Sequence, residues 1–108
     1  MAVTHTALDS IEKLDGLIER SNREPLLIFK HSSSCGISAM VIRRMDEVDA
    51  EVNVLVVQDA RDVSDAIEER TGIRHESPQA IILKNGEAIY YSSHYSINPQ
   101  AIMAELNS

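Results

Sequence analysis

Residues 26–38 read LLIFKHSSSCGIS, and this stretch decides the fold of the chain. Its first four residues, Leu26 to Phe29, form a short continuous apolar run, which is typical of a strand buried on both faces. The polar residues 31–34 predict a loop. From Cys35 onward apolar residues recur at helical spacing, and those expected on the inner face of this helix are Ile37, Met40, Val41, Met45 and Val48. The stretch therefore predicts a buried strand, a loop and a helix, with the chain's one cysteine where the helix begins.

The sequence on either side predicts more helices and strands in alternation. Ser10 is a good helix N-cap, Gly72 is typical of a helix end, and Asn98 followed by Pro99 is typical of a helix start. Asn85-Gly86 between two apolar runs is a strong hairpin signal. The expected helices cover Ser10–Ser21, Asp62–Arg70 and the residues after Asn98, and the expected further strands cover Val52–Val57, Ala80–Leu83 and Glu87–Tyr91.

The expected order is therefore α-β-α-β-α-β-β-α. Strands that alternate with helices indicate a parallel βαβ unit, and the closing hairpin adds an antiparallel pair. We expect an α/β fold with a mixed four-stranded sheet flanked by helices. With 108 residues and ordinary globular composition, the chain is expected to form a single domain over residues 1–108.

Composition limits the classes of function. A net charge of −7 opposes binding to the phosphate backbone of nucleic acids. Residues 1–9 lack a basic region followed by an apolar run, so we expect no secretory signal, and no apolar stretch approaches the roughly 18 residues that span a bilayer. One cysteine cannot form an intramolecular disulfide, which fits a reducing compartment. We expect a cytoplasmic protein with neither a nucleic-acid nor a membrane partner.

Cys35 is the main candidate for chemistry. A cysteine at a helix N-terminus faces unpaired backbone N–H groups and the positive end of the helix dipole, and both favour the nucleophilic thiolate. An inert core cysteine is the common alternative, but the three serines before Cys35 argue against it. We therefore expect a reactive thiol.

Two more positions are candidates near that thiol. Ser38 follows Cys35 by three residues and shares its helical face, so its hydroxyl could donate to the thiolate or could serve only backbone or solvent. Ser77-Pro78 precedes the third expected strand, at a place where a cis peptide bond is inexpensive, although a trans loop proline is commoner.

The histidines suggest a metal site only weakly. His31, His75 and His94 could in principle join Cys35, but the sequence has no CxxC, no HExxH and no His pair at i, i+4 spacing. We expect no metal and no bound cofactor.

Three segments resemble the YtxJ-like monothiol bacilliredoxins, a thioredoxin-fold family associated with the small thiol bacillithiol. The first, KHSSSCGIS at residues 30–38, is similar to the family's Thr-Cys-Pro-Ile-Ser motif, with Ser34 in place of threonine, Gly36 in place of proline, and Ile37 and Ser38 matching. The others are TGIRHESPQ at residues 71–79 and SSHY at residues 92–95. They contain His75 and His94.

The resemblance implies a function. Cys35 would be the nucleophile, Ser38 would replace a resolving cysteine, Pro78 would be a cis-proline facing Cys35, and the Ser77 backbone would pair with the substrate. Bacillithiol would be the co-substrate and S-bacillithiolated proteins the partners. Two alternatives stay open: exchange with glutathione or a protein thiol, and a thioredoxin-fold binding module in which Cys35 is incidental.

Overall fold

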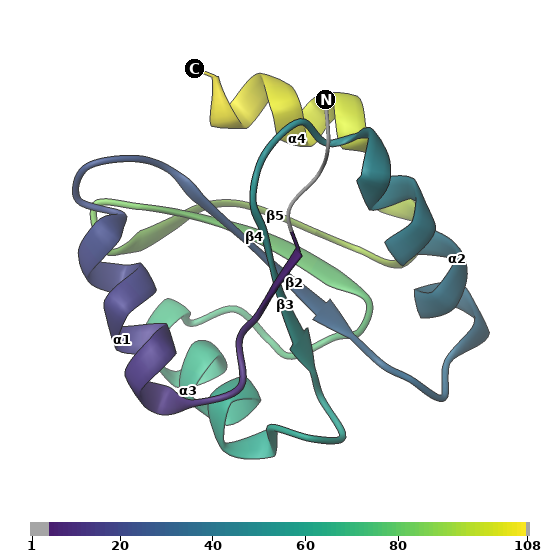
Figure 1. The fold of residues 1–108 in the computed structure, drawn as a ribbon, viewed down its shortest axis with the longest axis horizontal. Coiled ribbons are helices and arrows are strands. Elements are labelled where there is room, and N and C mark those ends of the chain that lie inside the picture. Colours follow the sequence, from purple (N-terminus) through teal and green to yellow (C-terminus); the bar gives the residue numbers. More distant parts are fainter. Residues whose placement is uncertain (1–4, 108) are drawn as a thin grey trace.

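A five-stranded mixed sheet forms the centre of the computed structural model, which describes residues 5–107 (Figure 1). The strands are β1 (His5–Ala7), β2 (Leu26–His31), β3 (Val52–Val56), β4 (Gln79–Lys84) and β5 (Glu87–Ser93). The helices are α1 (Ile11–Arg20), α2 (Gly36–Arg44), α3 (Arg61–Thr71) and α4 (Pro99–Leu106), and the short 3-10 helices are η1 (Met45–Glu47) and η2 (His94–Ser96).

The strands lie in the order β1-β3-β2-β4-β5. Strands β1 and β2 both run parallel to β3, whereas β4 pairs antiparallel with β2 and with β5. The parallel βαβ unit and the closing hairpin that the sequence predicts are therefore both confirmed. This order places β2, which leads to Cys35, in the middle of the sheet.

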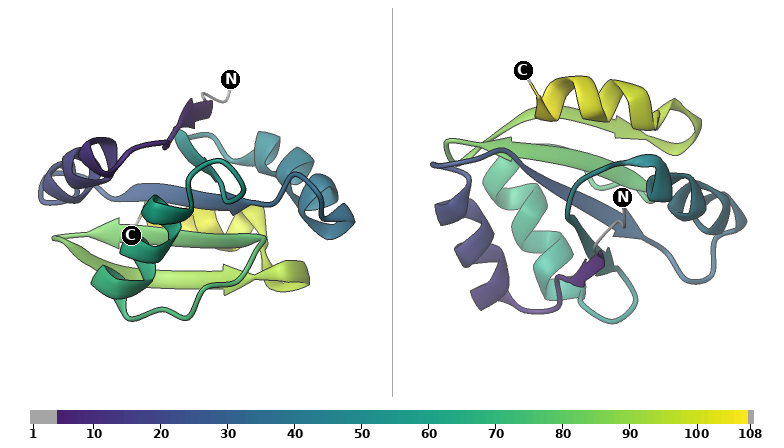
Figure 2. Two further views of the ribbon diagram at one scale, coloured as in Figure 1. Left: turned by 90° about the horizontal axis from the view of Figure 1, so that it is seen from below. Right: turned by 45° about the horizontal axis from the view of Figure 1, so that its top comes forward.

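Helices cover both faces of the sheet (Figure 2). On one face, α1 and α3 pack on a cluster that includes Leu26, Ile28 and Leu55; on the other, α2 and α4 pack on a cluster that includes Leu27 and Phe29. Successive residues of a strand point to opposite faces, so β2 supplies apolar side chains to both layers. The expectation of a strand buried on both faces is confirmed.

Caps fix several helix ends where the sequence predicts them. The Ser10 side chain accepts a hydrogen bond from the Lys13 N–H, and the Asn98 side chain accepts from the N–H groups of Gln100 and Ala101. Gly72 ends α3 at φ 73°, a left-handed conformation that glycine adopts without steric cost.

The prediction of four strands is wrong by one strand, because β1 adds a fifth at the edge of the sheet. β1 has three residues, too few to show a clear pattern of alternation, and it is a strand because it pairs with β3. Met40, expected on the inner face of its helix, is 42% exposed. The helix expected through Val48 instead ends at Arg44 and continues as η1.

Ser21 links the end of α1 to the β4–β5 turn and yields a stability prediction. Its carbonyl oxygen accepts from the Asn85 N–H (2.7 Å), and its fully buried hydroxyl accepts from the Gly86 N–H (2.8 Å). Ser21→Ala leaves the Gly86 N–H without its partner, so we expect the free energy of unfolding to fall by about 1–2 kcal/mol. Chemical denaturation measures this free energy, and Ser96→Ala, at an exposed serine, is the control. Equal stability of the two variants would contradict this role.

Candidate functional site

Cys35 is the N-cap residue of α2, directly after the loop that leaves β2, as the sequence predicts. Its backbone is extended, its side chain makes no capping hydrogen bond, and the thiol is partly exposed. The N–H groups of the first turn of a helix have no partner within the helix. The sulfur is therefore accessible to a substrate at the positive end of the helix dipole.

Gln58 fastens the loop before Cys35. Its amide nitrogen donates to Ser32 Oγ (2.7 Å) and Ser34 Oγ (3.0 Å), and its carbonyl oxygen accepts from the Ser33 N–H (3.1 Å). One side chain from the segment after β3 thus holds all three residues that precede the cysteine. Ser34 is engaged in this way and is exposed.

Ser38 is fully buried beneath the same loop. Its hydroxyl accepts from the Ser32 N–H (2.9 Å) and lies 2.8 Å from His31 Nδ1. Of the two roles left open for Ser38, the structure shows hydrogen bonding to the backbone, at Ser32, together with a contact to His31. The reason is that the Ser32 N–H, just past the end of β2, is buried without a strand partner. Burial lowers the pKa of His31, which favours the neutral ring.

The first turn of α2 contains the other two residues of the expected motif. Gly36 is exposed, and a Cβ built on it would meet no heavy atom within 4 Å. A larger side chain would therefore fit at this position without a steric clash of its Cβ. Ile37 is partly buried and packs against the apolar cluster under α2 and α4.

The Ser77–Pro78 peptide bond is cis, at the start of β4. Pro78 is buried, and its carbonyl oxygen accepts from the His94 N–H (2.9 Å). β4 is paired directly with β2, the strand that leads to Cys35. His94 itself adopts a positive φ of 54° where β5 passes into η2.

A buried lysine lies one residue before His31. Lys30 is fully buried, and its Nζ lies 3.1 Å from Nδ1 of His75, which also lies 3.2 Å from Ser64 Oγ. Burial lowers the pKa of Lys30 to about 8, against the opposing effect of Glu68 and Asp65. Burial and the Lys30 charge both lower the pKa of His75. This contact ties β2 to the segment before the cis-proline.

The three histidines thus occupy separate surroundings. Within the described part of the chain, His, Cys, Asp and Glu side chains form no group of three or more that could hold a metal ion. Every helix between residues 5 and 107 is too short or too polar to span a lipid bilayer.

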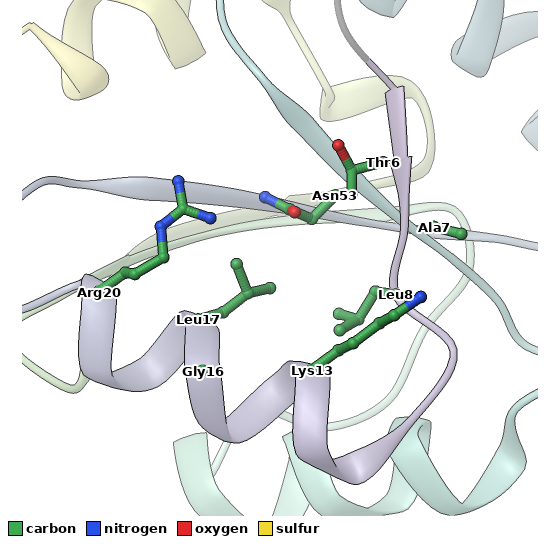
Figure 3. Close-up of a pocket in the computed structure, with 8 residues that line it drawn as sticks. All are labelled: Thr6, Ala7, Leu8, Lys13, Gly16, Leu17, Arg20 and Asn53. Carbon is green, nitrogen blue, oxygen red and sulfur yellow. The ribbon is translucent and has the colours of Figure 1, made fainter.

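A pocket lies between α1 and β1, away from Cys35 (Figure 3). Leu8 and Leu17 face it, and its volume is about 230 Å³. None of its lining residues comes from the Cys35 loop or the Pro78 segment. The two positively charged side chains that line it already have partners, since Lys13 forms an ion pair with Asp9 and Arg20 forms one with Glu51.

Gln58, Lys30 and Ser64 are site residues that sequence reasoning missed. Lys30 carried a signal, because a charged residue directly after four apolar strand residues is unusual for a strand buried on both faces. Gln58 and Ser64 carried none, since their partners lie 24–26 and 11 positions away in the chain.

The burial of Lys30 predicts a pH dependence of stability. Its pKa is about 8 in the folded protein and about 10.5 when the chain is unfolded, so between these values the unfolded state binds more protons and stability rises with pH. Relative to Lys30→Met, the wild type should gain about 2–3 kcal/mol in unfolding free energy between pH 7 and pH 11. Guanidinium denaturation of both proteins across that range measures it. A difference that stays constant with pH would contradict the assignment.

Comparison with known proteins agrees with this architecture. Residues 6–102 match the family model of monothiol bacilliredoxin BrxC. A solved structure assigned as an oxidoreductase with a thioredoxin fold has 32% identity and a TM-score of 0.86, with 97% of this chain and 95% of that chain covered.

Thioredoxins are similar in fold at lower identity. Thioredoxin from Schistosoma mansoni has 18% identity and a TM-score of 0.75, covering 95% of this chain and 98% of that one. Thioredoxin from Trypanosoma brucei brucei has 13% identity and a TM-score of 0.76, covering 96% and 88%. The chain therefore belongs to the monothiol bacilliredoxin BrxC family of thioredoxin-fold thiol oxidoreductases.

Proposed function

We propose that this oxidoreductase removes bacillithiol from mixed disulfides on protein cysteines, with Cys35 as its nucleophile. The observation that carries the proposal is the position of Cys35. It is the N-cap residue of α2, its thiol is partly exposed, and the side chain makes no capping hydrogen bond. The sulfur lies at the N-terminus of α2, where the helix dipole is positive. It is also accessible to an incoming disulfide.

The reaction is a thiol–disulfide exchange. The Cys35 thiolate attacks the bacillithiol sulfur of the mixed disulfide, a new S–S bond forms to Cys35, and the bond to the target protein breaks. The target cysteine leaves as a thiolate and takes a proton from water. A second thiol then attacks the bacillithiol sulfur of this adduct, forms a disulfide with bacillithiol, and releases Cys35 as a free thiolate.

The lack of a second thiol supports the one-cysteine route. Ser38 stands three residues after Cys35, and its hydroxyl is bonded to Ser32 and His31. A hydroxyl cannot displace the bound thiol by forming a disulfide. The adduct on Cys35 should therefore persist until an external thiol arrives.

Family membership supports bacillithiol as the small thiol, and glutathione is the alternative co-substrate. No bound cofactor is needed, because the exchange uses only sulfur atoms of the protein and its substrates. We propose the cytoplasm as the location, where a reducing environment keeps a lone cysteine free.

Cys35→Ser is expected to abolish the exchange and preserve the fold, because the thiol makes no capping bond and is partly exposed. Intact-mass measurement after incubation with oxidised bacillithiol should show one adduct on the wild type and none on the variant. Circular dichroism and the melting temperature report the fold. An unfolded variant would mean that the sulfur has a structural role, and an adduct on the variant would place the reaction at another residue.

Ser38→Cys is expected to convert the one-cysteine site to a dithiol site. Residues three apart on a helix have Cβ atoms about 5–6 Å apart, and a disulfide needs about 3.5–4.5 Å, so the loop–helix junction must shift slightly. The new thiol should then displace bacillithiol from Cys35 by internal attack, with a loss of two hydrogens in the final mass.

Ser38→Ala is the matched control, because it removes the hydroxyl without adding a thiol. Its adduct should remain stable, like that of the wild type. A stable adduct on Ser38→Cys as well would show that position 38 does not present a thiol to Cys35.

A further inference from the structure

A polar pocket of about 150 Å³ lies outside the Cys35 motif. It is lined by Val57, Arg61, Ser64, Asp65 and His75. Three of these residues come from the first two turns of α3, and His75 comes from the segment before the cis-proline. The pocket is therefore built by two segments far apart in sequence.

Val57, one of the pocket residues, connects the pocket to the loop before Cys35. The Val57 N–H donates to the His31 carbonyl oxygen (2.9 Å), and its neighbour Gln58 is bonded to Ser34, the residue before Cys35. His75 precedes Ser77 of the cis-proline bond by two residues. The two segments that line the pocket therefore continue directly into Gln58, which binds the Cys35 loop, and into the cis-proline bond.

Buried Lys30 fixes the protonation of His75. A lysine ammonium can only donate, so His75 Nδ1, 3.1 Å from Lys30 Nζ, must be the acceptor. The Ser64 hydroxyl lies 3.2 Å from the same nitrogen and can donate to it as well. With Nδ1 unprotonated, the proton of the neutral ring is on Nε2. His75 is exposed, so its Nε2–H is available as a hydrogen-bond donor.

The pocket carries charges of both signs. Arg61 and the His75 Nε2–H are donors that suit a carboxylate, whereas Asp65 is an acceptor that suits an amine. Glu68 adds negative potential near Lys30 and His75. A purely anionic ligand would be repelled by Asp65, so a ligand with both groups fits better.

We propose that this pocket binds the charged part of the small thiol whose sulfur is transferred to Cys35, a cysteine-based thiol that carries both a carboxylate and an amine. Arg61 and His75 bind the carboxylate, and Asp65 binds the amine. This inference rests on the proposed exchange at Cys35 and adds the part of the protein that recognises the co-substrate.

The test compares two symmetrical disulfides. Oxidised bacillithiol carries both charged groups, and hydroxyethyl disulfide carries neither. In each case the Cys35 thiolate forms a disulfide with one half of the reagent and releases the other half as a thiolate. The rate of adduct formation is followed by intact mass on the wild type, Arg61→Gln and Asp65→Asn. His75 is left unchanged, because its removal would leave the buried Lys30 without its partner.

Both variants should slow the reaction with oxidised bacillithiol by about threefold to tenfold and leave that with hydroxyethyl disulfide unchanged. Arg74→Gln and Asp62→Asn are the controls. They remove the same charges from exposed neighbours that do not line the pocket, and they should have little effect.

Asp65→Asn gives the sharpest outcome. If only the overall charge mattered, loss of a negative charge would make this variant react faster with oxidised bacillithiol, which is rich in carboxylates. Loss of the proposed contact between Asp65 and the amine makes the variant react more slowly. Faster reaction of Asp65→Asn, or equal effects of the variants and their controls, would overturn the pocket assignment while Cys35 exchange stands. Failure of the wild type to react with either disulfide would overturn the exchange itself.

Discussion

Burial of β2 on both faces is the constraint on which the rest of the structure depends. Leu26 and Ile28 pack under one helical layer, and Leu27 and Phe29 under the other. A strand in this position needs partners on both edges, which β3 and β4 provide. The chain can reach the surface only where β2 ends, and Cys35 begins the next helix four residues after that end.

Side-chain hydrogen bonds hold the loop between β2 and α2, where the chain leaves the buried strand. Past His31 the backbone loses its sheet partners while Ser32 is still buried, and a buried N–H without an acceptor is costly. Ser38 supplies that acceptor, and Gln58 binds the three serines. The loop is thereby fixed, and the cysteine next to it keeps its thiol free of a capping bond.

The cis-proline segment is held beside β2 in a similar way. His94 donates its N–H to the Pro78 carbonyl oxygen, and Lys30 contacts His75 three residues earlier. A charged lysine on a strand that is buried on both faces costs stability. It is tolerated because the imidazole nitrogen of His75 accepts a hydrogen bond from its ammonium group. The same contact leaves the outer nitrogen of His75 as a donor at the surface, so a core interaction determines what a nearby pocket offers to a ligand.

The sequence by itself determined the features that depend on neighbouring residues. Ser10, Gly72 and Asn98 fixed helix ends, Asn85-Gly86 fixed the hairpin, and the run before Cys35 predicted the strand and helix that meet there. Capping and hydrophobic periodicity act over a few residues, so they can be read from the chain. Only the tertiary structure decided that His5–Ala7 is a strand, that Ser38 bonds to His31 and Ser32 instead of the thiol, and that Lys30 meets His75. The β1 pairing and the Lys30–His75 contact join segments 47 and 45 residues apart, and they exist only after the sheet order has brought those segments together. The Ser38 bonds span only six and seven residues, but they depend on the conformation of the loop between β2 and α2.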